Sequence, residues 1–279
     1  MSDRARLLLR GAPVALVLLL GLGWLLPEPG GLSLGSGDGE AARRVETTLD
    51  AMRDAPLVVV GFDPDVGTYP EIRPTVRVLL ADLLARDAQL VFVSLTPEGR
   101  ALLVAELGRL EAGGIEPSAI VDLGFVSGAE AALVSLSRSV RAPGGAPEAV
   151  GARLAAFGLA AADLIVVVGG NDLGPRTWVE QALPRVGQPP TVAIAPTILL
   201  PELVPYVESG QLDGLIATPM DGASYRAAVD PEGQRDGADR PPDPLALFLG
   251  MLVAVGVVGQ ALGARLVPGL RLLRRGERA

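Results

Sequence analysis

The residues of this sequence that could do chemistry are carboxylates, hydroxyls and an amide placed at or just after apolar runs. Asp63 and Asp65 follow the run Leu57–Phe62, and Ser94 lies near the end of the next run. Paired carboxylates can act as nucleophile and general acid or base, or hold a divalent cation. The catalytic candidates are Asp63, Asp65, Ser94 and Asp172, and the metal-ligating candidates are Asp63, Asp65 and Asp172. The ligand-binding candidates are Thr96, Ser127, Glu130, Gly169, Gly170, Asn171 and Asp221.

Composition narrows this chemistry. The 279-residue chain has no His and no Cys, and all 24 of its basic residues are Arg, so Lys is absent as well. These absences exclude a His general base, a zinc site of His and Cys, a Cys nucleophile, a Schiff-base Lys and a phosphate-binding loop with its Lys. Any catalysis would therefore depend on Asp, Glu, Arg, Ser, Thr or Tyr, or on a metal held by carboxylates.

Three segments resemble the motifs of the haloacid-dehalogenase phosphatases. The run Leu57–Asp65 resembles the first motif, Val91–Ser94 the second, and Val166–Asp172 loosely resembles the acidic last motif. The resemblance implies that Asp63 attacks phosphorus, that Asp65 handles the proton and that both help to hold magnesium. The sequence departs from the family pattern because it has no Lys and because Val66 precedes the Gly-Thr pair. Ordinary turns rich in Asp, Pro and Gly, with helix caps at Asn171 and Asp172, are the alternative interpretation.

Three other segments, Leu123–Ala132, Tyr206–Leu215 and Asp221–Tyr225, resemble an uncharacterised family of bacterial membrane-anchored α/β proteins. That resemblance implies membrane anchoring and an α/β domain, and it implies no activity. The sequence departs from the family pattern at Phe125, Ala129 and Ser224. From the residues themselves, Ser209 and Gly210 predict the end of a helix, and Glu130 suits the first turn of one.

Apolar runs that alternate with helical periodicity predict the fold. Continuous Val, Ile and Leu runs are typical of strands buried on both faces, and strand–helix alternation favours a parallel sheet. We expect an α/β fold with a doubly wound, mainly parallel sheet of the Rossmann or flavodoxin type. The expected strands are Leu57–Phe62, Leu90–Leu95, Ala119–Phe125, Leu164–Val168, Thr191–Ala195 and Gly214–Ala217. The expected helices are Ala41–Arg53, Glu71–Arg86, Pro97–Glu111, Ala129–Ser139, Ala149–Ala162, Arg176–Pro184 and Glu202–Ser209.

Two further apolar runs predict transmembrane helices that flank this domain. The first covers 11–26, or 7–26 if Arg10 reaches back to the interface, and the second covers 244–264. A cleaved signal peptide is the alternative for the first run, but no Ala-x-Ala site follows it. Arg residues concentrate in 1–10 and 265–279, so the positive-inside rule places both ends in the cytoplasm. The expected order is therefore a cytoplasmic 1–10, a tether 27–39, an extracytoplasmic domain 40–229, an acidic tether 230–243 and a basic cytoplasmic tail 265–279.

The part of the chain between the two apolar runs is strongly acidic. Residues 27–243 contain 16 Arg and 30 Asp or Glu, a formal charge of −14. Nucleic-acid binding needs a basic surface, so we expect none. We expect instead a cell-membrane protein that presents a binding, sensing or assembly module, with the lipid bilayer and other membrane proteins as partners. The alternatives are a magnesium-dependent phosphatase-like enzyme that uses Asp63 and Asp65, and a small-ligand receptor.

Overall fold

The computed structural model describes residues 39–114 and 119–229. The predicted transmembrane helices, both cytoplasmic ends, the 230–243 tether and all but the last residue of the 27–39 tether lie outside these ranges. Within them, none of the helices combines the length and the apolar character that crossing a membrane requires.

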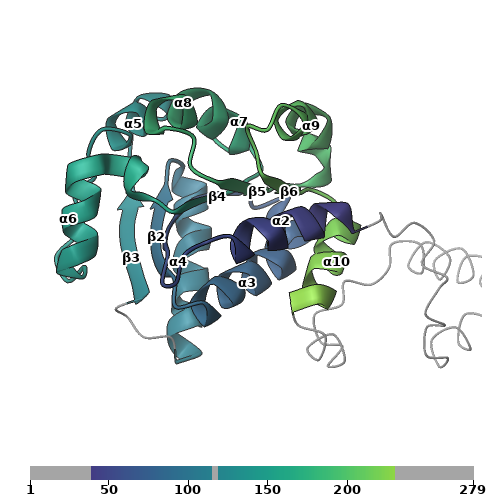
Figure 1. The fold of residues 1–279 in the computed structure, drawn as a ribbon, viewed down its shortest axis with the longest axis horizontal. Helices are drawn as coiled ribbons and strands as arrows, with labels where there is room; N and C mark the ends of the chain where they lie inside the picture. The colour runs from purple at the N-terminus through teal and green to yellow at the C-terminus, as the bar shows by residue number, and fades with distance from the viewer. Residues whose placement is uncertain (1–38, 115–118, 230–279) are drawn as a thin grey trace, which may run out of the picture. The chain divides into compact units, whose positions relative to one another are not determined.

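Six parallel strands form one sheet, in the order β3-β2-β1-β4-β5-β6 (Figure 1). After β1 the chain builds β2 and β3 on one side and then crosses back to add β4 on the other side of β1. The direction of winding therefore reverses between β1 and β4, which is the topological switch point of a Rossmann-type sheet. The strands are β1 Leu57–Asp63, β2 Gln89–Ser94, β3 Ile120–Phe125, β4 Leu164–Gly169, β5 Thr191–Ile194 and β6 Gly214–Ile216.

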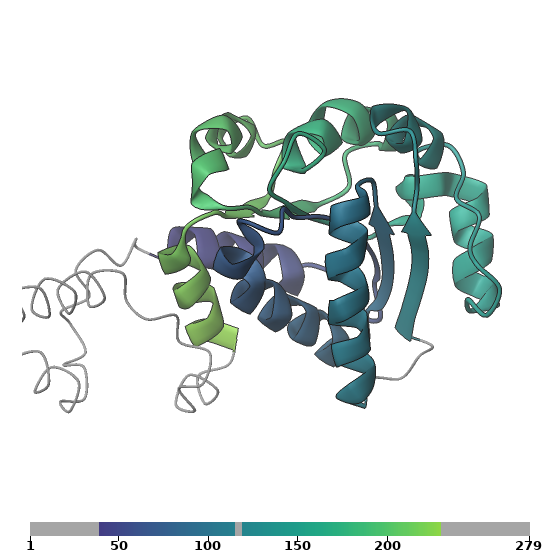
Figure 2. The same cartoon turned by 180° about the vertical axis from the view of Figure 1, so that it is seen from behind.

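Helices cover both faces of the sheet (Figures 1 and 2). One face carries α2 Glu40–Asp50, α3 Tyr69–Ala85, α4 Pro97–Ala112 and α10 Pro219–Val229. The other face carries α5 Glu130–Leu136, α6 Glu148–Phe157, the 3-10 turn η2 Gly158–Ala161, α7 Pro175–Thr177, the π-helical turn η3 Trp178–Ala182, α8 Leu183–Val186, the 3-10 turn η4 Thr197–Leu199 and α9 Leu200–Glu208.

The alternation of side chains along each strand divides the core into two layers. In β1, Leu57 and Val59 face the layer under α5 to α9, whereas Val58, Val60 and Phe62 face the layer under α2, α3, α4 and α10. All seven residues of β1 are buried. The sequence prediction of an α/β fold with a parallel sheet is confirmed, and every strand pair among the described residues is parallel.

Two predicted helices differ from the structure, and one observed helix was not predicted. The expected helix over 149–162 ends at Phe157 and continues as a 3-10 turn, because Gly158 takes a φ of +57°. The expected helix over 176–184 contains the π-helical turn η3. Helix α10 was not predicted, since its buried face within the core consists of little more than Gly222 and Tyr225 and leaves a weak apolar pattern.

Candidate functional site

Asp63 ends β1 at the switch point, where its register partner is Gly169 of β4. The side chain is only 1% exposed, and its Oδ1 accepts three hydrogen bonds from the segment that follows β2. The donors are the backbone N–H of Leu95 at 2.8 Å, the backbone N–H of Thr96 at 2.8 Å and the Thr96 hydroxyl at 2.9 Å. The Asp63 carboxylate therefore joins the ends of β1 and β2.

The other carboxylate oxygen of Asp63, Oδ2, is buried without a hydrogen-bond partner in the part of the chain that the structure describes. Burial raises the pKa of Asp63 to about 6, against the opposing effect of the hydrogen bonds from Thr96 and Leu95. Removal of a carboxylate from water disfavours its charged form, and three donors on one oxygen only partly compensate. Asp63 is thus a buried acid that keeps its proton at mildly acidic pH.

Both predicted hydroxyls at the end of β2 are engaged with the protein itself. The Ser94 hydroxyl is fully buried and donates to the Phe62 carbonyl at 2.8 Å. Thr96 is the N-cap of α4, and its Oγ1 accepts from the Gly99 backbone N–H at 3.0 Å while donating to Asp63. An N-cap of this kind satisfies one of the free N–H groups of the first turn. These hydroxyls position the loop after β2.

Three acidic side chains, Asp65, Glu98 and Asp172, lie in the loops and the helix start that follow β1, β2 and β4. We call this edge of the sheet, at the carboxyl ends of its strands, the rim. Burial raises the pKa of Asp65, the Asn171 side chain lowers it, and the charges of Glu98 and Asp172 raise it. The Val66 backbone N–H donates to Glu98 at 2.6 Å, and Asp172 is exposed. Within 39–114 and 119–229, however, no group of three His, Cys, Asp or Glu side chains could hold a metal ion. As arranged, Asp63, Asp65 and Asp172 do not fit a magnesium site.

The two glycines after β4 allow the loops of the switch point to pack against each other. A Cβ atom on Gly170 would lie 2.6 Å from the Thr68 Oγ1 and 3.0 Å from the Asp65 Oδ2. A Cβ atom on Gly169 would lie 2.6 Å from the Cα of Gly174. The close approach that Gly169 and Gly170 permit is thus used by the chain's own loops.

The amide of Asn171 also serves the loops. Its Nδ2 donates to the Asp63 carbonyl at 2.9 Å, and its Oδ1 accepts from the Leu173 backbone N–H at 2.9 Å. Asn171 therefore ties the loop after β4 to the end of β1. The donor–acceptor distances of these hydrogen bonds are typical of N–H···O bonds between backbone groups, which suits a positioning role for Asn171.

The remaining candidates lie at other strand ends. Ser127 and Glu130 are exposed around the start of α5, after β3. Asp221 follows β6 and accepts from the Thr218 hydroxyl at 2.7 Å, while the Asp221 backbone N–H donates to that hydroxyl at 3.0 Å. This reciprocal pair caps the first turn of α10. The structure therefore gathers eight of the candidates at the ends of β1, β2 and β4, namely Asp63, Asp65, Ser94, Thr96, Gly169, Gly170, Asn171 and Asp172.

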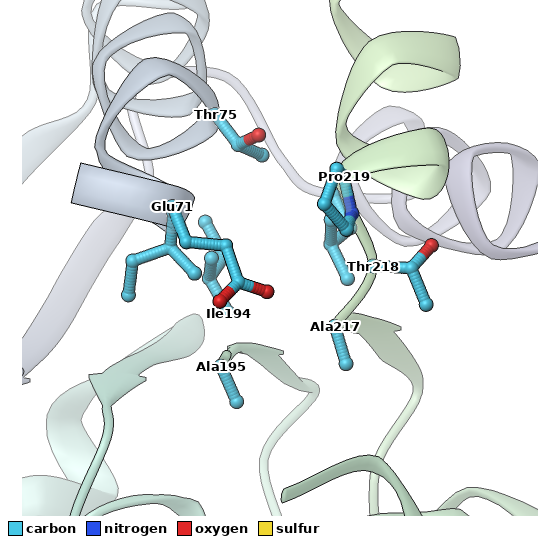
Figure 3. Close-up of a pocket in the computed structure, with 9 residues that line it drawn as sticks. Glu71, Thr75, Ile194, Ala195, Ala217, Thr218 and Pro219 are labelled. Carbon is cyan, nitrogen blue, oxygen red and sulfur yellow. The ribbon is translucent and has the colours of Figure 1, made fainter. Parts of the chain in front are cut away.

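Sequence reasoning missed several polar groups of the rim. Thr68 lies against Gly170, and its hydroxyl is buried without a hydrogen-bond partner among the described residues. Glu71, in the first turn of α3, accepts from the Thr197 backbone N–H at 2.9 Å and from the Thr197 hydroxyl. Figure 3 shows Glu71 and Thr75 facing the ends of β5 and β6 across a cavity of about 10 Å³, which has room for about one water molecule. The only sequence signal for the role of Glu71 is its position in the first turn of a helix.

Comparison with known proteins adds little to this geometry. No model of a known protein family matches the chain, and no curated protein matches it. A solved structure titled "Structure of MT0777" is similar to it at 16% sequence identity, with 66% of this chain and 97% of that chain covered and a TM-score of 0.35. A similarity at this TM-score supports no inference about activity or ligand.

Proposed function

We propose that this chain is an integral membrane protein whose α/β domain is a non-catalytic assembly module on the outer side of the membrane, bound to other membrane proteins. The apolar runs 11–26 and 244–264 support the anchoring, and the Arg residues of 1–10 and 265–279 support the orientation. Two anchors restrict the domain to a layer near the bilayer, where it meets other membrane proteins at high effective concentration.

One observation carries the non-catalytic part of the proposal. The polar groups at the switch point are bonded to the chain's own loops: Asp63 Oδ1 to the end of β2, Ser94 to Phe62, and Asn171 to Asp63. A catalytic group needs a free lone pair or proton aimed at a substrate position. These groups instead hold the three loops in place.

The charge of the domain supports a protein partner over a nucleic acid or an anionic lipid surface. The −14 formal charge of 27–243 repels phosphates, and it keeps the domain away from acidic headgroups. A protein surface with exposed basic and apolar groups is the complementary partner.

Cross-linking in native membranes, followed by identification of the linked proteins, tests the proposal. We expect the full chain to be recovered in a stable complex with a defined partner protein. Repeated recovery of the monomer alone would overturn the assembly role. Reporter fusions after residue 229 test the orientation, and a cytoplasmic reporter at that position would overturn the extracytoplasmic assignment.

The Oδ2 of Asp63, which has no hydrogen-bond partner within 39–114 and 119–229, favours the alternatives, a phosphatase-like enzyme or a small-ligand receptor. A hydrolysis assay separates the enzyme from the assembly module. If the full chain hydrolyses p-nitrophenyl phosphate with magnesium, and if Asp63→Asn abolishes that activity while Asp54→Asn, at an exposed position, leaves it intact, the non-catalytic proposal fails. We expect no hydrolysis above that of the Asp63→Asn variant.

A further inference from the structure

One end of the sheet carries an apolar groove. It has a volume of about 270 Å³ and runs beside β6, the last strand of the sheet, which has no further strand beyond it in the described part of the chain. We call it the β6 groove. Its lining consists of Glu40, Ala41 and Arg44 of α2, Leu200, Val204, Val207 and Glu208 of α9, Leu215 of β6 and Asp221 of α10.

The margin of the β6 groove is acidic. Three carboxylates, Glu40, Glu208 and Asp221, stand around it with one arginine, Arg44. Arg44 already pairs with Glu40 at 2.6 Å, so the net charge of the margin is negative. An occupant with an apolar group for the floor and basic groups for the margin would complement this groove.

The opposite end of the domain carries two exposed arginines. Arg138 and Arg141 are exposed on the strap between α5 and α6, and Phe157 at the end of α6 is 60% exposed. We call these three residues the α6 patch. Hydrogen bonds from Val140 to Leu154 and from Ser139 to Ala155 fasten the strap to α6.

The two arginines of the α6 patch have no acidic partner among the residues that the structure describes. Neither guanidinium forms an ion pair with a residue in 39–114 or 119–229. In contrast, Arg153 of α6 and Arg53, which precedes β1, both pair with Asp163. An exposed aromatic ring beside two unpaired arginines is a combination that is enriched in protein interfaces.

We propose that copies of this chain associate head to tail, with the α6 patch of one copy seated in the β6 groove of the next. Figures 1 and 2 show α6 and α9 at opposite ends of the sheet, so the two surfaces are separate on one molecule. Such a contact is heterologous, and its repetition gives a ring or a row. The proposal names the partner of the assembly role proposed above and rests on it.

Size and charge both favour this occupant. A cavity of about 150 Å³ accepts benzene, so the β6 groove has room for the ring of Phe157. Arg138 and Arg141 would then face the acidic margin. A two-fold contact between two β6 grooves would place Glu208 and Asp221 of each copy near the same acids of the other. The head-to-tail contact therefore places opposite charges together in domains that otherwise repel one another.

Single cysteines can test the contact without background because the chain contains no Cys. Ser209→Cys places a thiol beside the β6 groove, and Gly144→Cys places one near the α6 patch, where an added Cβ meets no atom within 4 Å. Differently tagged full chains carrying these changes are mixed in neutral phosphatidylcholine vesicles and treated with a short bis-maleimide. We expect mixed dimers to exceed the dimers formed by either variant alone. The control is Val104→Cys on α4, 51% exposed and part of neither surface.

Charge reversal then tests the complementarity. Arg138→Glu with Arg141→Glu in the Gly144→Cys copy should lower the mixed-dimer yield roughly fivefold or more, as expected for two lost interface charge pairs. Glu208→Arg in the other copy should restore part of the yield. Phe157→Ala should lower it roughly tenfold, as for an aromatic interface anchor. Unchanged fluorescence of the buried Trp178 would show that each variant is folded.

Three outcomes would overturn the head-to-tail contact. They are dimers only between two Ser209→Cys copies, mixed dimers no more abundant than the Val104→Cys control, and binding of the α6 patch to phosphatidylglycerol vesicles without self-association. Because this assay contains no other protein, it is independent of the native-membrane experiment. Native complexes with a different protein, combined with no mixed dimer here, would leave the assembly role standing and remove the self-association.

Discussion

The buried carboxyl of Asp63 gives the sharpest test of the site geometry. Replacement of Asp63 by Asn keeps an oxygen that can accept the hydrogen bonds of Leu95 and Thr96, and it removes the charge. The substitution also preserves size, so the tight packing around β1 is retained. What changes is the free energy needed to hold an ionised group at a position that is 1% exposed.

The pKa of Asp63 fixes the magnitude and the sign of its contribution to the free energy of unfolding. It rises from 3.8 to about 6, mainly through burial. A tenfold change in proton affinity is worth about 1.4 kcal/mol, so ionisation of Asp63 costs the folded state about 3 kcal/mol. Because the folded state binds this proton more tightly than the unfolded state, the contribution of Asp63 to stability is complete below pH 4. It is lost as the pH rises from about 4 to 6.

Urea unfolding between pH 4 and pH 8 measures this effect. Trp178 packs on Gly61 of β1 and reports on the core, and Trp24→Phe removes the other Trp of the chain. We expect the free energy of unfolding of Asp63→Asn, relative to the parent, to increase by about 3 kcal/mol from pH 4 to pH 8. Most of that increase should fall between pH 4 and 6.

Asp54→Asn, at an exposed position before β1, is the matched control for the loss of a carboxylate. The difference between its free energy of unfolding and that of the parent should change by less than about 0.5 kcal/mol over the same pH range. If the Asp63→Asn difference is as flat as that of the control, the carboxyl is not held in the desolvated position described here. If the difference falls as the pH rises, hydrogen bonding outweighs burial and the sign of the reasoning is wrong.

Three further predictions concern the supports of the site and the core. Thr96→Val should cost about 1 kcal/mol through the lost N-cap of α4 and should raise the pKa of Asp63 further, so its pH transition, followed by urea unfolding, should shift upward. Ala129→Gly should stabilise the domain by about 0.5 kcal/mol in thermal unfolding, because Ala129 holds a φ of 50° that glycine adopts without strain; a lower Tm would contradict this. Glu106 is 3% exposed, and although burial raises its pKa, the Arg77 hydrogen bonds bring the pKa below its ordinary value. Glu106→Gln should cost about 3 kcal/mol at pH 7 in urea unfolding, and the cost should shrink as acid protonates Glu106 in the parent.

The sheet could be predicted from the sequence because its strands are continuous apolar runs. Leu164–Val168 and Leu57–Phe62 can satisfy their burial only between two layers of helices, and that requirement already implies a parallel sheet. The positions of Asp63 and Asn171 at strand ends followed from the same runs. Their neighbourhood at the switch point depends on strand order, which is set by long-range packing and has no local signal.

The direction of each polar side chain could not be predicted either. Ser94 could point to a ligand or to a neighbouring strand, and the structure turns its hydroxyl to the carbonyl of Phe62. The sequence pattern is the same in both cases, because the difference lies in a single rotamer. Trp178 illustrates the converse, because a large apolar ring has few alternatives to burial: it lies fully buried against Gly61, where a Cβ would approach its ring to 2.4 Å.

The character of the rim explains why we place binding at the ends of the sheet. In Rossmann-type sheets the loop after β1 approaches an anionic ligand with glycines and a helix N-terminus. Here that loop is Asp63-Pro64-Asp65, and Glu98 and Asp172 add negative charge beside it. An anionic ligand would meet like charges there and would have to displace the hydrogen bonds that join the loops. The β6 groove and the α6 patch carry charges of opposite sign, and the hydrogen bonds that join the loops after β1, β2 and β4 lie at neither of them, so association between them leaves those loops in place.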